Sequence, residues 1–239
     1  MTSKSIQDLT ERGVLSTLWE ETCAALEGLF PMRETPIPRE FALRLPLNPK
    51  SDSVLTFNDR AVEGVGDLRA TLIAGSRAEI VNVMLFPADV QRHPVFASEI
   101  VVFAKALRVG VIDLQPLVRT QEQEGLIEGD LAALRSRFGD LSDGGELPDW
   151  AREHFTPACV HVREPGLESL PRLREAYLAY LRLFIQYVRN NPGTPAATED
   201  PALRHYKDHH IANTPGWPFL SRLYGEDWTR RFLREGMYA

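Results

Sequence analysis

The sequence predicts an α+β fold, in which helices pack against an antiparallel β-sheet. Between residues 53 and 114, five short segments rich in Val, Ile, Leu and Phe follow one another with brief connections. Consecutive strands joined by short turns pair antiparallel. Segments with helical periodicity bracket this block and do not alternate with its strands. Both faces of the central strands are mostly apolar, so we expect the sheet to be covered on each side.

The first half of the chain begins with a predicted helix at 6–30, where apolar residues recur at helical spacing. The proline-containing stretch 31–49 is expected to be extended. The strands, each bounded by Pro, Gly or polar turn residues, are predicted at 53–58, 68–74, 79–86, 99–103 and 107–114.

The second half is predicted to be mainly helical. A helix at 121–138 is followed by a polar loop that continues to residue 150, and residues 158–163 alternate like a strand. The clearest helix is 171–189, which opens on proline and carries an apolar stripe. Two further helices are predicted at 200–211 and 217–235. We expect residues 1–239 to form one domain with a large core.

Composition points to a soluble cytoplasmic protein. The chain is 44% hydrophobic and 25% charged, as is usual for globular proteins. No apolar run is long enough to span a bilayer, and the N-terminus lacks the apolar core of a signal peptide. A net charge of −6 argues against nucleic acid as a partner.

The cysteine content limits the redox chemistry that the chain can perform alone. Cys23 and Cys159 are its two cysteines, too few for an iron–sulfur cluster, which needs about four ligands. No disulfide is expected in a reducing compartment. Electrons for any redox reaction must therefore come from outside.

Three polar residues interrupt the apolar strands: Asn82, Glu99 and Asp113. A carboxylate inside a covered sheet is costly, so Glu99 needs a partner, a raised pKa or a chemical role. The alternative is a strand end with its carboxylate in solvent. Asp113 is expected to end its strand or cap the following turn.

A histidine-rich helix segment raises the question of a metal. His205 and His209 stand at i and i+4 on one helix face, beside His210. This spacing suits a metal ion, but the sequence identifies no third ligand and no glutamate where a zinc hydrolase needs one. We therefore predict no metal site and interpret these residues as a polar helix face or a ligand contact.

Several motifs together resemble the ferredoxin-dependent bilin reductases. In order along the chain they are NVMLFP, HPVFASEIVVF, GVIDLQP, ELPDW at 146–150, the helix at 171–189, and NTPGWPFLSRLYGEDWTRRFL at 213–233. The resemblance covers roughly residues 53–235. Because the motifs are spread over the chain in the family's order, they are more specific than any single short pattern.

The resemblance implies an α/β/α three-layer sandwich with a central, mainly antiparallel sheet. It implies that biliverdin IXα lies between the sheet and the C-terminal helices and is reduced to a phycobilin or a dihydrobiliverdin. Members of the family bind no metal or flavin and take single electrons from a reduced [2Fe–2S] ferredoxin. A monomer is usual in the family.

The resemblance also assigns roles to residues. The family's central aspartate falls on Glu99, which would donate a proton to the pigment, while Asn82 would orient the pigment by hydrogen bonding. Thr214 stands where a second aspartate is typical, and Asn213 beside it is kept in some relatives. Substrate-binding roles extend to Thr214, Asn213 and Trp150.

Propionate contacts depart from the family pattern. Basic residues of phycocyanobilin-forming members fall on Gly145 and Pro215, and a histidine and a glutamate of that group fall on Leu68 and Ala70. Replacement candidates for binding the propionates are Arg60, Arg69, Lys207 and His210. His161 is the candidate second proton donor. With one obvious donor, we expect a single two-electron reduction.

Two other functions remain open from the sequence. One is a protein that binds a bilin without reducing it, because the second aspartate is missing. The other is a reductase of a different linear tetrapyrrole, such as a chlorophyll catabolite. A glutamate at the Glu99 position also suits the red chlorophyll catabolite reductases.

Overall fold

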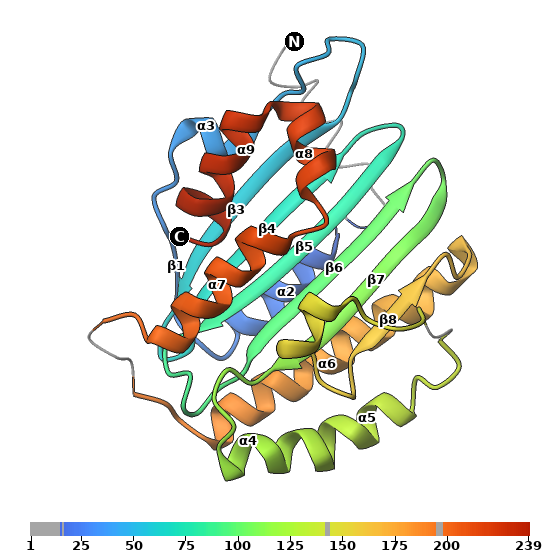
Figure 1. The fold of residues 1–239 in the computed structure, drawn as a ribbon. Helices are drawn as coiled ribbons and strands as arrows, with labels where there is room; N and C mark the ends of the chain where they lie inside the picture. Colours follow the sequence, from blue (N-terminus) through green and yellow to red (C-terminus); the bar gives the residue numbers. More distant parts are fainter. Residues whose placement is uncertain (1–14, 16, 142–143, 195–197) are drawn as a thin grey trace.

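The computed structural model describes residue 15 and residues 17–141, 144–194 and 198–239. In this part of the chain, eight strands form one sheet in the order β1-β3-β4-β5-β6-β7-β8, with β2 also paired to β3 (Figure 1). Every pair is antiparallel. The strands are β1 (Met32–Glu34), β2 (Leu43–Arg44), β3 (Val54–Val62), β4 (Gly66–Ala74), β5 (Ala78–Pro87), β6 (Val95–Phe103), β7 (Ala106–Gln115) and β8 (Val160–Arg163).

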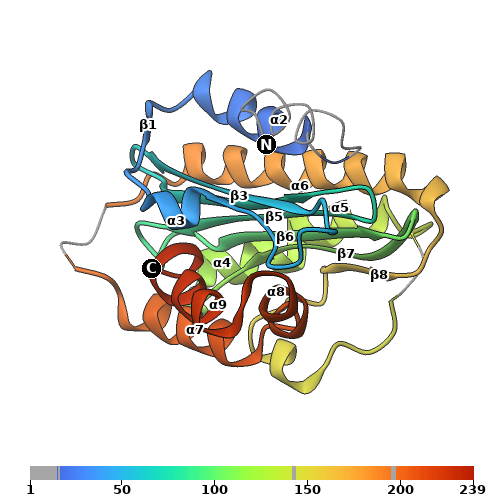
Figure 2. The same ribbon diagram turned by 90° about the horizontal axis from the view of Figure 1, so that it is seen from above.

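Helices cover both faces of this sheet, so the predicted three-layer sandwich is confirmed. Figure 2 shows α2 (Thr17–Glu27) and α6 (Leu170–Asn190) above the sheet. The C-terminal helices lie below it. The lower layer consists of α3 (Arg39–Ala42), α7 (Pro201–Asn213), α8 (Trp217–Tyr224) and α9 (Glu226–Phe232).

The face under α2 and α6 is packed with apolar side chains. Phe184, which has no exposed surface, contacts Phe96 of β6 at a ring-centroid distance of 6.1 Å. The two buried tyrosines of α6 have partners for their hydroxyls: Tyr177 is hydrogen-bonded to Thr22 of α2, and Tyr180 donates to the carbonyl of Ala158 at 2.5 Å. A buried hydroxyl without a partner is costly, and the layer contains one: the hydroxyl of Tyr187, also on α6, is buried and has no hydrogen-bond partner among the described residues.

The opposite face holds a second apolar cluster beneath α9. Phe41, Phe57 and Trp228 pack around Phe232, and the rings of Trp228 and Phe232 stack 4.8 Å apart. Its strand residues come from β3, β4 and β5 and include Val95 and Ala97 of β6. Among the described residues the cluster includes none of β7 or β8, so this side of the sheet is left for other elements to cover.

The predicted segments differ from the structure mainly at their ends. Residues 31–49 contain β1, α3 and β2 where an extended chain was expected. The helix predicted at 217–235 is wrong as a single helix: it breaks at Gly225, whose φ of 95° requires glycine, and α8 and α9 lie on either side. The helix predicted at 121–138 begins as α4 (Gln121–Leu126), passes through a π-helical turn and ends as α5 (Ala132–Ser136).

The N-terminal helix prediction is tested only in part. Helix α2 occupies 17–27 of the predicted 6–30, and residues 6–14 and 16 lie outside the described residues. Cys23 and Cys159 are free and buried. None of the described helices has the length and apolar character needed to cross a membrane.

Candidate active site

The floor of the site is a row of side chains on the sheet face toward the C-terminal helices. Asn82 on β5 stands directly opposite Glu99 on β6. The next strands bring Val111 opposite Glu99 and His161 opposite Val111. Directly opposed side chains of antiparallel strands have Cβ atoms about 4.5–5.5 Å apart. The predicted meeting of Asn82 and Glu99 on one face is therefore confirmed, and His161 lies two strand spacings away, roughly 10 Å.

Glu99 lies in an environment that favours its neutral form. Burial raises the pKa of Glu99 above its ordinary value, and a hydrogen bond from the Asn82 side chain opposes this shift only in part. The amide Oδ1 of Asn82 is buried and has no hydrogen-bond partner among the described residues. The floor therefore combines a carboxyl group that tends to keep its proton with an acceptor whose bonding capacity is unused.

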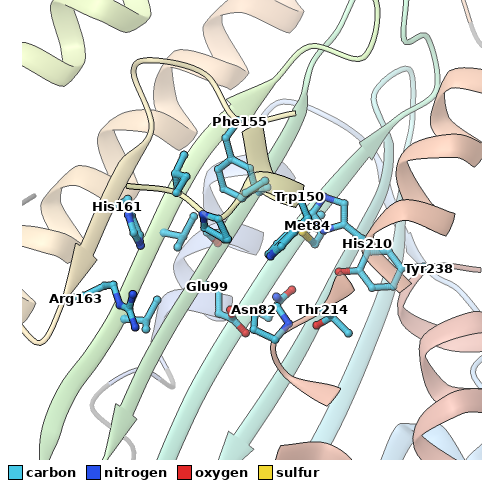
Figure 3. A pocket seen from close by; sticks show the side chains of 18 residues that line it. Asn82, Met84, Glu99, Trp150, Phe155, His161, Arg163, His210, Thr214 and Tyr238 are labelled. Atoms are coloured by element: carbon cyan, nitrogen blue, oxygen red, sulfur yellow. The ribbon is translucent and has the colours of Figure 1, made fainter. Parts of the chain in front are cut away.

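The roof over this floor comes from the segment between β7 and β8. A 3₁₀ turn (Asp149–Glu153) follows Leu147 and Pro148, and it carries Trp150 above the sheet. Phe155 follows this turn and contacts Trp150 edge to face at 6.2 Å. These apolar groups face the row that contains Glu99 (Figure 3).

Asp113 fastens the roof to the sheet. Its buried carboxylate accepts hydrogen bonds from the backbone N–H of Thr156 at 2.7 Å and from the Thr156 hydroxyl at 2.6 Å. Burial raises the pKa of Asp113 to about 7, although these hydrogen bonds act in the opposite direction. The strand continues beyond Asp113 to Gln115, so the predicted role as a strand end is wrong. Its partner is a loop residue 43 positions away.

The third wall consists of His210, Thr214 and Tyr238, from α7 and the chain beyond it. The rings of His210 and Tyr238 stack 5.8 Å apart with an interplanar angle of 25°. Burial, with smaller contributions from neighbouring histidines, lowers the pKa of His210 to about 3. At neutral pH this wall therefore presents an uncharged imidazole. The pKa of the Tyr238 phenol is raised by burial and by the nearby Glu99.

The three walls enclose a cavity with about 1030 Å³ of empty space, including its open mouth. Its lining is mainly apolar, with a few polar groups that converge from the sheet and from α7. This is the usual composition of a pocket for an organic ligand. Arg163 of β8 is the one lysine or arginine side chain in this lining, and it has no ion-pair partner among the described residues.

Six of the ten predicted site residues meet at this cavity. They are Asn82, Glu99, Trp150, His161, His210 and Thr214. The His161 ring packs against Gly144, where a Cβ atom would lie 2.7 Å from its Nδ1. A glycine at position 144 therefore allows this ring its position in the wall.

Arg60 does not reach the cavity. It lies on the other face of β3, where its guanidinium stacks over Trp19 of α2 and its Nη1 is 2.6 Å from Glu27 Oε1. Adjacent residues of a strand point to opposite faces, and Asp59, next to Arg60, points toward the C-terminal helices and bonds Arg69. A substrate-binding role for Arg60 therefore has no place in this cavity.

Arg69 and Lys207 lie on the correct face but hold the chain terminus. The carbonyl of Ala239 accepts a hydrogen bond from Arg69 Nη1 at 2.8 Å and another from Lys207 Nζ at 2.5 Å. Lys207 also pairs with Glu199 at 2.6 Å. Neither side chain lines the cavity. Both cations are compensated by protein groups and lie outside the cavity lining, so the propionate-binding roles predicted for them have no support in this geometry.

Asn213 is adjacent to the cavity without lining it. Its side-chain amide donates to the carbonyl of His209 at 2.8 Å, which stabilises the end of α7. Thr214, the next residue, enters the wall in its place.

Sequence reasoning missed Arg163 and Tyr238. Arg163 alternates with His161 on β8 and therefore shares its face, a relation visible in the sequence. Tyr238 lies three residues beyond the motif-bearing stretch 53–235, and no local pattern distinguishes it. Its place at the cavity depends on the path of the chain after α9.

Comparisons with known proteins agree on one family. The family model that matches is described as ferredoxin-dependent bilin reductase and spans residues 19–238. A phycoerythrobilin:ferredoxin oxidoreductase of Synechococcus sp. is 27% identical over 179 residues, which is 71% of this chain and 69% of the relative. A 15,16-dihydrobiliverdin:ferredoxin oxidoreductase of Gloeobacter violaceus is 22% identical over 219 residues, 89% of this chain and 90% of the relative.

Solved structures with the same fold include phytochromobilin synthase from tomato, determined in complex with biliverdin, which matches with a TM-score of 0.83 at 19% identity. The match covers 94% of this chain and 82% of that chain.

Proposed function

The chain belongs to the ferredoxin-dependent bilin reductase family, and from this premise we propose that it reduces biliverdin IXα with electrons from reduced [2Fe–2S] ferredoxin. The product is a dihydrobiliverdin or a phycobilin. The observation that carries the proposal is the Glu99 carboxyl, kept toward its neutral form on the floor of a cavity open to a flat organic ligand. A neutral carboxyl is a proton donor, which is what reduction of a conjugated pigment requires.

The reaction takes two electrons and two protons for each double bond reduced. Each ferredoxin supplies one electron, so two ferredoxin molecules are oxidised per bond. The added electrons make the pigment more basic. Glu99 then transfers its proton to the pigment and is left as a carboxylate, which the Asn82 side chain stabilises by hydrogen bonding. Solvent at the open mouth of the cavity restores the proton to Glu99.

We assign the second proton to His161. Its ring lines the same cavity, and its Nδ1 has no hydrogen-bond partner among the described residues. Roughly 10 Å separates the strands of Glu99 and His161, a span that places the two donors at different parts of an extended pigment. Thr214 stands where relatives carry another acid, and this supports reduction of one bond rather than two.

The remaining lining orients the pigment. Trp150 and Phe155 offer aromatic surface on the side opposite the sheet, and such rings pack well against a conjugated plane. Arg163 is the available cation for a propionate side chain, since Arg69 and Lys207 are engaged with Ala239. A guanidinium binds a carboxylate through two parallel hydrogen bonds, so Arg163 would fix the pigment at the β8 side of the cavity.

A second candidate function is pigment binding without reduction. It is favoured by Thr214, which cannot donate a proton as a carboxylic acid can. Glu99→Gln distinguishes the two functions: a reductase should lose turnover in this variant and still bind the pigment, whereas a binding protein has no turnover to lose.

The test uses biliverdin under anaerobic conditions, first with the protein alone and then with photoreduced ferredoxin. Binding alone should change the pigment's absorption modestly. Electron supply should bleach the long-wavelength band and produce a blue-shifted product carrying two additional hydrogen atoms. Biliverdin that binds but keeps its spectrum throughout electron supply would contradict the proposal.

A further inference from the structure

A second cluster of reactive side chains lies outside the cavity, between the roof segment and α7. Glu153 and His154 come from the end of the 3₁₀ turn, and His205 and His209 come from one face of α7. Each can contribute one ligand atom such that all four atoms lie within 4.8 Å of one another. The sequence offered only the two histidines of α7, and the fold brings the third and fourth ligands beside them.

The distances within the cluster fit one small cation. A tetrahedral ion with bonds of 2.0–2.1 Å keeps its ligand atoms about 3.4 Å apart. Glu153 Oε1 lies 2.7 Å from His205 Nε2 and 3.9 Å from His154 Nε2, and Glu153 Oε2 lies 3.4 Å from His209 Nδ1. These carboxylate–imidazole separations bracket the expected value, and all four ligand atoms lie within 4.8 Å of one another, so side-chain movements would draw the imidazoles into the shell.

One ligand atom of this cluster has no hydrogen-bond partner within the described part of the protein. His154 is buried, and its Nε2 has no hydrogen-bond partner among the described residues. At 3.9 Å from Glu153 it is too far for a hydrogen bond. A buried polar atom without a partner is costly, and a cation held by all four groups would satisfy it.

His209 already has the second contact typical of a metal-bound imidazole. Its Nε2 donates to the backbone carbonyl of Trp150 at 2.7 Å, which leaves Nδ1 directed at Glu153. Ligating histidines usually donate their other ring N–H to a carbonyl or carboxylate. This bond also connects the cluster to Trp150, the residue that covers the pigment cavity.

We propose that Glu153, His154, His205 and His209 bind a divalent first-row transition ion, with Zn²⁺ the best match. Three imidazoles and one carboxylate suit Zn²⁺, whereas Mg²⁺ and Ca²⁺ prefer oxygen ligands. Four protein ligands fill a tetrahedral shell, which is typical of a structural site. The ion joins the 3₁₀ turn to α7 and so fixes two walls of the cavity relative to each other. Its role is structural and separate from the proton chemistry at Glu99.

The test titrates Zn²⁺ alone into the tag-free protein, without pigment, because a linear tetrapyrrole could itself bind the ion. Calorimetry should give one ion per chain. A hundredfold excess of Zn²⁺ over its Kd should raise Tm by about 5–10 °C. Co²⁺ should give the visible absorption of a four-coordinate ion with nitrogen and oxygen ligands.

Two cluster variants and one control make the test specific. His205→Ala and Glu153→Gln change exposed side chains, so they should fold normally and bind Zn²⁺ more than about tenfold more weakly. Asp208→Asn, an exposed change on α7 outside the cluster, should bind as the wild type does. No calorimetric binding, or equal binding by His205→Ala and the wild type, would overturn the proposal.

Discussion

The two faces of the sheet are built from the same strands and differ in what covers them. Under α2 and α6, apolar side chains fill the space, and the hydroxyls of the fully buried Tyr177 and Tyr180 have partners. On the other face, the apolar cluster beneath α9 reaches from β3 to the first residues of β6, and the roof segment lies over β6 to β8. Two residues of β6 that point to opposite faces show the contrast: Phe96 points into the packed layer, and Glu99 points into the cavity.

This difference shows how one sheet separates stability from chemistry. The packed face has few ways to tolerate a polar group, because each would lose its hydration without gaining a partner. The cavity face holds Glu99, Asn82 and His161 in fixed register and leaves space beside them. Substitutions on the two faces should therefore change different measurements.

The largest effect is expected from Glu99→Gln. The amide keeps the shape of the side chain but cannot donate an acidic proton, so turnover should fall by about 10²–10⁴-fold. Biliverdin binding, followed by absorption, should change little.

Glu79→Gln is the matched control for this substitution. Glu79 lies on neighbouring β5 on the packed face, where it accepts a hydrogen bond from the N–H of Leu15 at 2.8 Å. Its replacement should leave turnover near the wild-type value. Equal losses in the two variants would show that the effect does not depend on the cavity.

Truncation of one phenylalanine on each face should separate stability from binding. Phe184→Ala should lower the free energy of unfolding by about 3–5 kcal/mol, because it opens a hole in the packed layer. Phe155→Ala removes a partly exposed roof residue and should cost about 1 kcal/mol, while it weakens biliverdin binding. Denaturant unfolding and pigment titration of both variants measure this contrast, and similar unfolding losses would contradict it.

Arg163→Gln tests whether Arg163 binds a propionate side chain of the pigment. Loss of a charged hydrogen-bonding partner should raise KM for biliverdin about tenfold and leave kcat nearly unchanged. Arg60→Gln, on the other face, is the control and should alter neither constant. A larger effect of the Arg60 substitution would mean that the pigment lies elsewhere.

The smallest effect is expected from Asn82→Leu. The hydrogen bond from Asn82 favours the Glu99 carboxylate, so its removal should raise the pKa of Glu99 further. Because the protonated acid is the active form, activity falls as pH rises through this pKa. The alkaline limb of the pH–rate profile should move up by about one pH unit, and a downward shift would contradict this reasoning.

Much of the fold follows from patterns that the sequence displays. Apolar strands with short turns predicted the antiparallel sheet, and polar residues inside them identified Asn82 and Glu99. The ends of the elements, and contacts between residues that are far apart in the sequence, could not be predicted from local patterns. The strand predicted at 53–58 stopped before Arg60, so the sequence did not assign this side chain to a face of the sheet. A shift of one residue along a strand reverses the face to which a side chain points. Arg69 and Lys207 bind Ala239, a partner distant in sequence that no local pattern identifies.

The roof segment illustrates the same limit. Its polar sequence predicted a loop up to residue 150, but this part of the chain forms a 3₁₀ turn, is bonded to Asp113 through Thr156 and reaches His205 and His209 on α7. Contacts between elements created the site there, whereas local propensity determined the strands of the floor.

The protonation state of Glu99 is the central claim, and infrared spectroscopy measures it directly. The difference spectrum between wild type and Glu99→Gln at pH 7 isolates this residue from Asp113, whose pKa is also raised. We predict the carbonyl stretch of a protonated carboxyl group, lost as pH rises through the raised pKa of Glu99. A difference spectrum that contains only carboxylate bands at pH 7 would contradict the account.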